Sequence, residues 1–332
     1  MRLLAADKTT LALPESQSLW KRFGAHKGQQ GVGPIAVELC CLFDLVSRAP
    51  LHFIYGKVCS SEHTLIDKLI KALKKGDLLL FDSGFYFCAT FFKILRRQAH
   101  FIIPAKKNMR PKILRTLGQG DYLCQIKDSY DHSTLTVRVV FVYRNGFRRR
   151  RLVTSLLDSI LFPASELARL YHMRWDIETF YRDFKHTLRA TSWHCQTPTT
   201  FHQELLVHMI VICLIRIAML EASRLANLSV ARLSFARALT ETRFFFKRLL
   251  SSTEKIPWDS FWAAFISCCM RHPIKFKPNR QFPRDKQQYR KKSRGLERLP
   301  AGRKPIPVKT ASTPPSPPET LKNIQGELYL LS

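Results

Sequence analysis

Short apolar runs separated by amphipathic segments fill the first third of the chain. The runs predict strands at 2–6, 35–45, 50–55, 78–81 and 101–105. The 35–45 run is apolar enough to be buried on both faces. Leucines at 65, 69 and 73, with lysines opposite, predict a helix over 62–73, and a second helix is expected over 85–98. Strands and helices that alternate in this way predict an α/β fold.

The pattern changes to strict alternation of apolar and polar residues from Asp121 onward. It predicts strands at 122–126, 135–143 and 151–156, with a hairpin turn at Asn145-Gly146. A helix is expected from about residue 163 to beyond Lys185, and further helices between about 200 and 270. A Pro-rich segment near residue 315 excludes regular structure there.

A large excess of positive charge is the main feature of the composition. The chain has 332 residues, 54 Lys and Arg and 25 Asp and Glu, which gives a net charge of +29. Such a surface favours a polyanionic partner. The segment 271–309 alone holds 14 basic and two acidic residues, or +12 of the excess. Charge by itself does not separate a nucleic-acid enzyme from a ribosomal or packaging protein.

Cysteine usage and hydropathy narrow the class of protein. The nine cysteines form no Cys-x-x-Cys pair. This spacing favours cysteines that act as small buried apolar side chains in a protein of a reducing compartment. His194-Cys195 has no spaced partner ligands, so zinc chemistry is not expected. The apolar run 205–220 is interrupted by His208 and Arg216 and predicts a buried helix of a soluble core rather than a membrane span.

Two aspartates share a context that favours metal chemistry. Asp7 and Asp82 each follow a short apolar strand and precede a polar, turn-like residue. Carboxylates at the ends of adjacent strands meet at one edge of a sheet, where their hard oxygen atoms can ligate a divalent metal. Many aspartates at strand ends are only caps or turn residues, so the pair alone leaves both interpretations open.

A third acid lies in a helical segment with regular spacing. Tyr171, Arg174, Glu178 and Lys185 stand at i, i+3, i+7 and i+14, so a helix projects all four from one face. An acid flanked by Arg, Lys and Tyr suits a metal ligand set among phosphate contacts. The alternative is an exposed face with ion pairs, such as Arg174 with Glu178.

These motifs together resemble a known family. The spacing Tyr-x2-Arg-x3-Glu-x6-Lys resembles the signature of the IS4-type DDE transposases, and Asp82-Ser83-Gly84-Phe85 resembles the Asp-x-Gly-aromatic motif around their second acid. The segment Asp7-Lys8-Thr9-Thr10 is similar to their first-acid motif, with Lys8 in place of the usual glycine. The resemblance covers roughly residues 2–220.

The resemblance implies an RNase H-like catalytic core, a mixed central sheet flanked by helices. In it Asp7, Asp82 and Glu178 would hold two divalent ions, Mg²⁺ or Mn²⁺, while Tyr171, Arg174 and Lys185 hold phosphates. The expected domains are a first part of the core (1–120), inserted β-strands (121–157), a second part of the core with C-terminal helices (158–270) and a basic, Pro-rich, disordered tail (271–332).

The implied function is that of a DNA transposase of a bacterial insertion sequence. It would cleave and join double-stranded DNA as a homodimer on paired ends, in the bacterial cytoplasm at the nucleoid. Arg148, Arg149, Arg150 and Arg151 are expected to bind phosphates without reading sequence. Family members carry a helical domain before the first acid, so an N-terminally truncated chain is expected. The alternatives are a non-transposing nuclease on the same fold and a DNA-binding relic without catalysis.

Overall fold

The computed structural model describes residues 1–28, 31–58, 60–128, 132–143, 149–251, 257–271 and 273–274. The turn expected at Asn145-Gly146, Arg148 and the tail from residue 275 lie outside the described residues.

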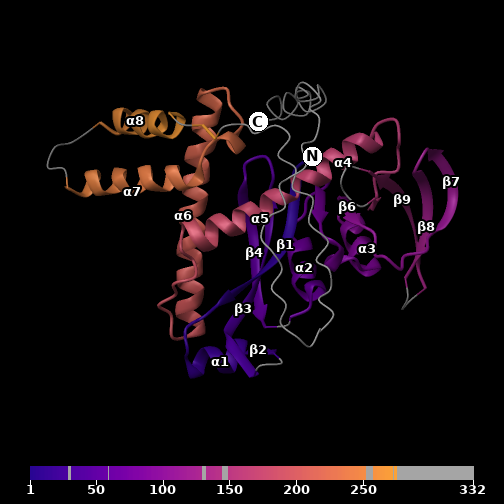
Figure 1. The fold of residues 1–332 in the computed structure, drawn as a ribbon, viewed down its shortest axis with the longest axis horizontal. Helices are drawn as coiled ribbons and strands as arrows, with labels where there is room; N and C mark the ends of the chain where they lie inside the picture. Colours follow the sequence, from indigo (N-terminus) through magenta and orange to yellow (C-terminus); the bar gives the residue numbers. More distant parts are fainter. Residues whose placement is uncertain are drawn as a thin grey trace, which may run out of the picture. The chain divides into compact units, whose positions relative to one another are not determined.

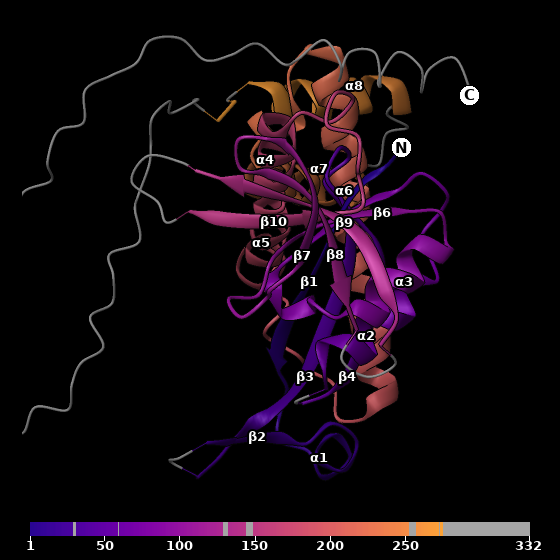
Figure 2. The same cartoon turned by 90° about the vertical axis from the view of Figure 1, so that its right-hand side faces the viewer.

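Ten strands of the described residues form one mixed sheet (Figures 1 and 2). Their order is β2–β3–β1–β5–β6–β10–β9–β8–β7, and β4 also pairs with β3. The strands are β1 (Leu3–Ala12), β2 (Ala25–Gly28), β3 (Gly31–Asp44), β4 (Ala49–Lys57), β5 (Leu78–Phe81), β6 (His100–Pro104), β7 (Lys112–Gly118), β8 (Asp121–Lys127), β9 (Thr134–Val142) and β10 (Arg150–Thr154).

The centre of the sheet combines both strand directions. β3 runs antiparallel to its neighbours β1 and β4, whereas β1, β5 and β6 are mutually parallel. β10 then pairs antiparallel with β6, and β9, β8 and β7 follow as antiparallel neighbours. The strands expected as an insertion therefore extend the central sheet at its β6 edge.

Helices cover both faces of this sheet. Alternate residues of β1 point to opposite sides, so Leu3 and Ala5 join one hydrophobic core and Leu4 and Ala6 the other. α2 and α3 pack in the second core, and α4, α5 and α6 in the first. The helices are α1 (Gln17–Phe23), α2 (Glu62–Ile70), α3 (Cys88–Arg96), α4 (Ala164–Met173), α5 (Trp175–Arg182), α6 (Pro198–Leu225), α7 (Phe235–Ser251) and α8 (Trp258–Met270). The predicted α/β class is confirmed.

Some elements differ from the sequence prediction. The 2–6 run continues without a break to Ala12, because β3 pairs with it along its whole length. β7 was missed because nearly all its residues are exposed, which removes the alternation that marks a half-buried strand. The helix expected from about 163 to beyond Lys185 is divided into α4 and α5 and ends in a π-helical turn, η2 (Asp183–Thr187).

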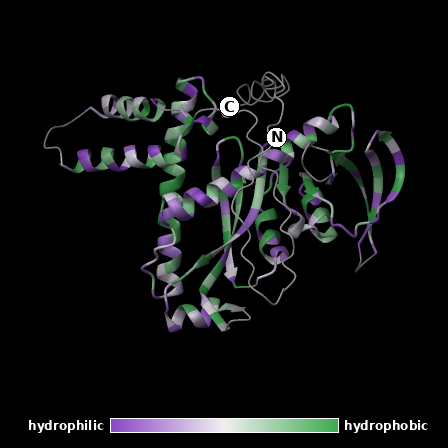
Figure 3. Ribbon diagram, viewed as in Figure 1, coloured by the Kyte–Doolittle hydropathy of each residue, from purple (hydrophilic) through white to green (hydrophobic). Residues whose placement is uncertain are grey.

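α6 is the longest helix of the described residues, and hydrophobic positions recur along it (Figure 3). It begins at a capping box in which the Thr197 and Thr200 side chains each accept a backbone N–H. By length and composition it is the one helix of the described part that could cross a membrane, a test that core helices of soluble proteins also pass. Arg216 in this helix is buried and its Nη2 donates to Asp183 at 2.7 Å.

The eight described cysteines are all free thiols. Burial raises the pKa of Cys41 to about 12 and that of Cys269 to about 12, so both stay protonated at neutral pH. These cysteines therefore act as small apolar side chains, as their spacing predicted.

Candidate active site

Asp7 lies on β1, and Asp82 directly follows the neighbouring strand β5. The parallel register pairs Ala6 of β1 with Phe81 of β5, so the two aspartates are the next residues along. Neighbouring strands are about 4.8 Å apart. Asp7 was expected at the end of its strand, and this was wrong, since β1 continues beyond it. Only β5 ends here, and its pairing with β1 stops at Ala6 and Phe81.

The turn after Asp82 brings a further carboxylate close to it. Asp82 Oδ1 accepts the Gly84 N–H at 2.8 Å and caps the short 3₁₀ helix η1 (Ser83–Phe85). A Cβ atom on Gly84 would collide with the Glu62 carboxylate and lie 3.0 Å from Asp82 Oδ1. The glycine of the Asp-x-Gly motif is therefore required by the close approach of two acidic side chains to its backbone.

Arg174 links the first and third acids. Its Nη2 donates to Glu178 Oε1 at 2.7 Å, and its Nη1 lies 3.8 Å from Asp7 Oδ2. The guanidinium is buried, whereas the side chain of Glu178 is 39% exposed. The ion pair considered as the alternative is thus present, but it lies beside Asp7 and not on a solvated helix face.

The acids act on one another electrostatically. Burial raises the pKa of Asp7 to about 6, and the carboxylates of Asp82 and Glu178 add to the rise. The Lys8 N–H, which Asp7 accepts at 2.8 Å, and the Arg174 guanidinium oppose it. Asp7 therefore carries negative charge that its own surroundings do not fully compensate.

We predict that Asp7→Asn stabilises the metal-free protein above pH 6 by up to roughly 3 kcal/mol. The reason is that the pKa of Asp7 is raised from 3.8 to about 6 in the folded chain. The unfolded chain loses this proton near pH 4 and the folded chain near pH 6, so the free energy of unfolding of the wild type falls as the pH rises between them. Urea unfolding in EDTA at pH 4 and pH 7.5 measures the effect. An equal stability difference at both pH values would contradict it.

Tyr181 of α5 fixes the backbone at Asp7. Its hydroxyl donates to the Asp7 carbonyl at 2.5 Å and accepts the Cys41 N–H at 3.1 Å. Asp7 and Cys41 are register partners of β1 and β3, so the hydroxyl bridges two groups of facing strand residues. This bridge ties the helix that carries Glu178 to the strand that carries Asp7.

Replacing Tyr181 by phenylalanine is expected to cost about 1–3 kcal/mol, because it removes the hydroxyl that bonds the buried Cys41 N–H and the part-buried Asp7 C=O. Thermal unfolding of Tyr181→Phe against the wild type measures this. Tyr143→Phe is the matched control, since Tyr143 is 71% exposed, and it should be neutral. Equal melting temperatures for all three proteins would refute the bridge.

The other two residues of the signature support this arrangement. Lys185, in η2, donates from Nζ to the Thr10 carbonyl of β1 at 2.7 Å, and burial lowers its pKa. Tyr171 is buried, and burial raises its pKa to about 12. Its ring centre lies 6.0 Å from the Arg174 guanidinium carbon. All four signature residues thus contact either β1 or each other.

Sequence reasoning missed a polar cluster beside Asp7. Lys8 Nζ lies 3.7 Å from Glu38 and 3.9 Å from Glu62, and the Thr10 hydroxyl donates to Glu38 at 3.2 Å. Glu38 is buried, and its single charge within the apolar 35–43 run was the signal that could have found it. Lys8, which replaces the family's usual glycine, thus places a cation between two further acids.

The arginines of the β9–β10 hairpin differ in their surroundings. The Arg149 guanidinium lies 4.3 Å from the centre of the Phe141 ring, and Arg150 is exposed. Arg151 donates to the carbonyls of Lys106, Lys107 and Met109, which holds the loop before β7. Of the described three, Arg149 and Arg150 remain exposed to solvent.

The donor chemistry of the acids suits a divalent cation, although no ready-made metal geometry is present. Carboxylate oxygens are hard ligands, and the uncompensated charge on Asp7 favours a cation. Among the residues that the structure describes, no three His, Cys, Asp or Glu side chains are arranged to hold an ion. In this arrangement Glu178 is paired with Arg174.

Comparison with known families agrees with these motifs. The model of a family described as "Transposase DDE domain" matches residues 1–214, which is well over half of the chain. The chain belongs to this family of transposases. The match includes all three acids and the signature residues.

Individual relatives give the same assignment. The chain is 28% identical over 254 residues to the transposase InsG of insertion sequence IS4 from Escherichia coli, covering 72% of this chain and 57% of InsG. A probable transposase of IS5377 from Geobacillus stearothermophilus is 26% identical, over 57% of this chain and 49% of that protein. The chain therefore spans about half the length of these relatives.

One solved structure is similar over much of the chain. It is the cryo-EM structure of a piggyBac transposase synaptic complex with hairpin DNA, with a TM-score of 0.41 and 12% identity, over 80% of this chain and 56% of that one. At that TM-score the likeness carries no weight beside the family match.

Proposed function

We propose that this chain carries the catalytic centre of an insertion-sequence transposase, which cleaves DNA strands and joins their ends with Asp7, Asp82 and Glu178. The observation that carries the proposal is their convergence. Asp7 and Asp82 are neighbours across two parallel strands, and Arg174 joins Asp7 to Glu178. These three acids come from segments that are far apart in the sequence.

The three carboxylates would hold two divalent ions, Mg²⁺ or Mn²⁺. Such ions, when bound, activate an oxygen nucleophile and stabilise the leaving oxygen of the phosphodiester. The chain's own residues orient the ligands: Tyr181 fixes the Asp7 backbone, Gly84 holds Asp82, and Arg174 holds Glu178. Arg174 and Lys185 also supply positive charge beside the acids for the phosphates of the DNA.

The order of the central strands supports an RNase H-like core. Across the sheet the strands lie in the order β4–β3–β1–β5–β6. The first three are mutually antiparallel neighbours, and the last two run parallel to β1. The first acid lies on the central strand β1 and the second directly follows its neighbour β5. The third comes from a helix that packs on β1.

Double-stranded DNA is the proposed substrate, bound by a homodimer on paired ends in the bacterial cytoplasm at the nucleoid. The net charge of +29 and the exposed Arg149 and Arg150 support a polyanionic partner. Free buried cysteines are typical of a reducing compartment. The names of the curated relatives support an insertion sequence as the source of the DNA.

Strand cleavage tests the proposal directly. We expect the chain to nick duplex DNA that carries the ends of its element in Mg²⁺ or Mn²⁺, to stop in EDTA, and to be inactive as Asp82→Asn. Asp67→Asn is the matched control, since Asp67 pairs with Lys93 between α2 and α3 and should leave cleavage unchanged. Joining of the cleaved 3′ ends to a target distinguishes a transposase from a nuclease. DNA binding without cleavage in either metal would instead indicate a relic.

A further inference from the structure

A shallow cavity of about 360 Å³ lies beside α1, away from the acid cluster. Its lining includes Trp20, Lys21, Arg22 and Lys57 and contains no acidic residue. Its volume is at the lower end of that of ligand pockets, which is roughly 300–1,000 Å³. α1 and β2 lie at the end of the sheet toward which β1 runs from Asp7 (Figure 1).

Trp20 is one of the two exposed tryptophans of the described residues. Its side chain is 46% exposed, and among the described residues neither a ring nor a cation stacks on it. Lys21, Arg22 and Lys57 are exposed beside it, and none of them forms an ion pair with a described carboxylate. An accessible aromatic face among unpaired cations is the combination that binds unpaired nucleotides.

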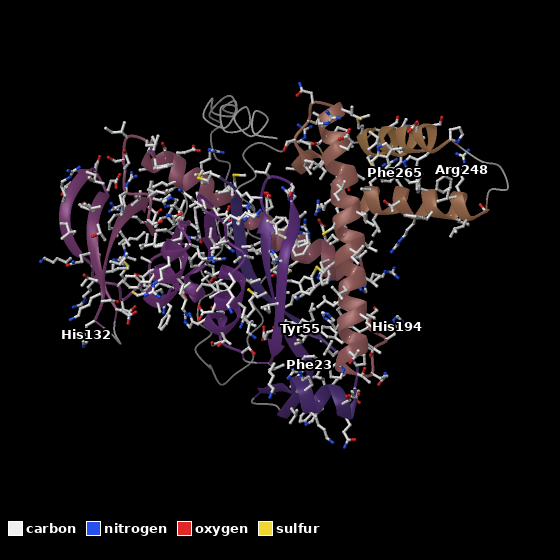
Figure 4. The ribbon with its side chains drawn as sticks, turned by 180° about the vertical axis from the view of Figure 1, so that it is seen from behind. Phe23, Tyr55, His132, His194, Arg248 and Phe265 are labelled. Atoms are coloured by element: carbon white, nitrogen blue, oxygen red, sulfur yellow. The ribbon has the colours of Figure 1, made fainter. Side chains whose placement is uncertain are left out.

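Aromatic packing and a backbone hydrogen bond fix the residues that line the cavity. The Phe23 ring centre is 6.0 Å from that of Tyr55 and 5.5 Å from that of Phe201, and Figure 4 shows Phe23 and Tyr55 close together just above α1. The Val58 N–H donates to the Phe23 carbonyl at 3.0 Å, which joins the end of β4 to α1. Trp20 and the three cations are therefore presented on a fixed surface and need little ordering on binding.

We propose that this cavity binds an unpaired nucleotide of the substrate DNA, with the base stacked on Trp20 and neighbouring phosphates on Lys21, Arg22 and Lys57. The inference rests on the proposed function for the identity of the DNA. β1 ends at Ala12, shortly before α1, and Asp7 and Ala12 are roughly 17 Å apart along the strand. The nucleotide in the cavity is therefore separated from the acids by several residues of β1. This site would hold a frayed or single-stranded segment near the cleaved end.

The test compares two DNAs in EDTA, where no cleavage occurs. One is a blunt duplex of about 20 base pairs, and the other carries an added single-stranded overhang of roughly six nucleotides. By fluorescence anisotropy, the wild-type chain should bind the overhang DNA more tightly. Trp20→Ala should lose roughly 5- to 100-fold in affinity for the overhang DNA, the usual value of one base stack, and less than about twofold for the blunt duplex. Trp20→Phe keeps a stacking face and should retain most of the affinity.

The three cations are tested by salt dependence. Replacing Lys21, Arg22 and Lys57 by glutamine should reduce the slope of log K against log salt by roughly 2 on the overhang DNA. The matched control replaces Arg243, Lys247 and Arg248 of α7, which are also exposed, and should leave the preference for the overhang unchanged. Phe244→Ala, at 66% exposure, is the control for removing an exposed ring.

Several results would overturn the proposal. One is a Trp20→Ala variant that binds both DNAs as the wild type does, and another is an α7 triple variant that loses the overhang preference equally. The proposed function is judged separately, by cleavage in Mg²⁺ and its loss in Asp82→Asn. If the wild-type chain cleaves DNA but its affinity for the overhang DNA does not depend on Trp20, this site alone is refuted. An overhang preference that depends on Trp20, in a chain that never cleaves, supports the site and refutes the catalytic proposal.

Discussion

Glu178→Gln is expected to reduce DNA strand cleavage on the order of a thousandfold, equivalent to about 4 kcal/mol of activation free energy. The substitution keeps the length of the side chain, and the amide oxygen can still accept the Arg174 bond of 2.7 Å. What is removed is the negative charge with which the acid would bind a divalent ion. The side chain is 39% exposed, so the free energy of unfolding should change by less than about 1 kcal/mol.

Glu166→Gln is the matched control for this experiment. Glu166 lies on α4, one element earlier, and pairs with Arg169 as Glu178 pairs with Arg174. The same change there should leave both cleavage and DNA binding unaltered. DNA binding by Glu178→Gln, measured in EDTA, should stay within a few-fold of the wild type. Cleavage at the wild-type rate by Glu178→Gln would remove this residue from the catalytic set.

Arg138→Met should destabilise the protein by about 3–5 kcal/mol. Arg138 is fully buried, and its Nε and Nη2 donate to the two oxygens of Asp121 at 2.7 and 2.5 Å. Its Nη1 donates to the carbonyls of Asp158 at 3.0 Å and Phe162 at 2.6 Å. The substitution leaves the buried carboxylate of Asp121 without its donor. It also removes the donor from the two carbonyls, which lie in the loop that leads into α4. Urea unfolding at pH 7 measures the loss.

Two further variants separate this explanation from simple loss of packing. Arg169→Met removes the cation of the more exposed Glu166 pair and should cost less than about 1 kcal/mol. The double variant Arg138→Met with Asp121→Leu removes the uncompensated charge and should recover part of the stability of Arg138→Met. A loss below about 1 kcal/mol in Arg138→Met, or no recovery in the double variant, would contradict the buried-pair explanation.

The sequence by itself determined many of the local elements and the identity of the motifs. The 78–81 run is β5 at the predicted bounds, and the 35–45 run lies in β3 except for its last residue, because hydrophobic period and length are properties of a short segment. The spacing of Tyr171, Arg174 and Glu178 also depends only on helical period, and those residues carried the family resemblance that the family match later confirmed.

Only the tertiary structure decided how these motifs meet. Strand register puts Asp7 beside Asp82, since pairing between residues far apart in sequence leaves no mark on either segment alone. The Tyr181 bridge, the approach of Glu62 to Gly84 and the position of Lys8 between Glu38 and Glu62 all depend on side chains from separate elements. Such contacts follow from packing of the whole chain, whereas periodicity reports only which face of each element is buried.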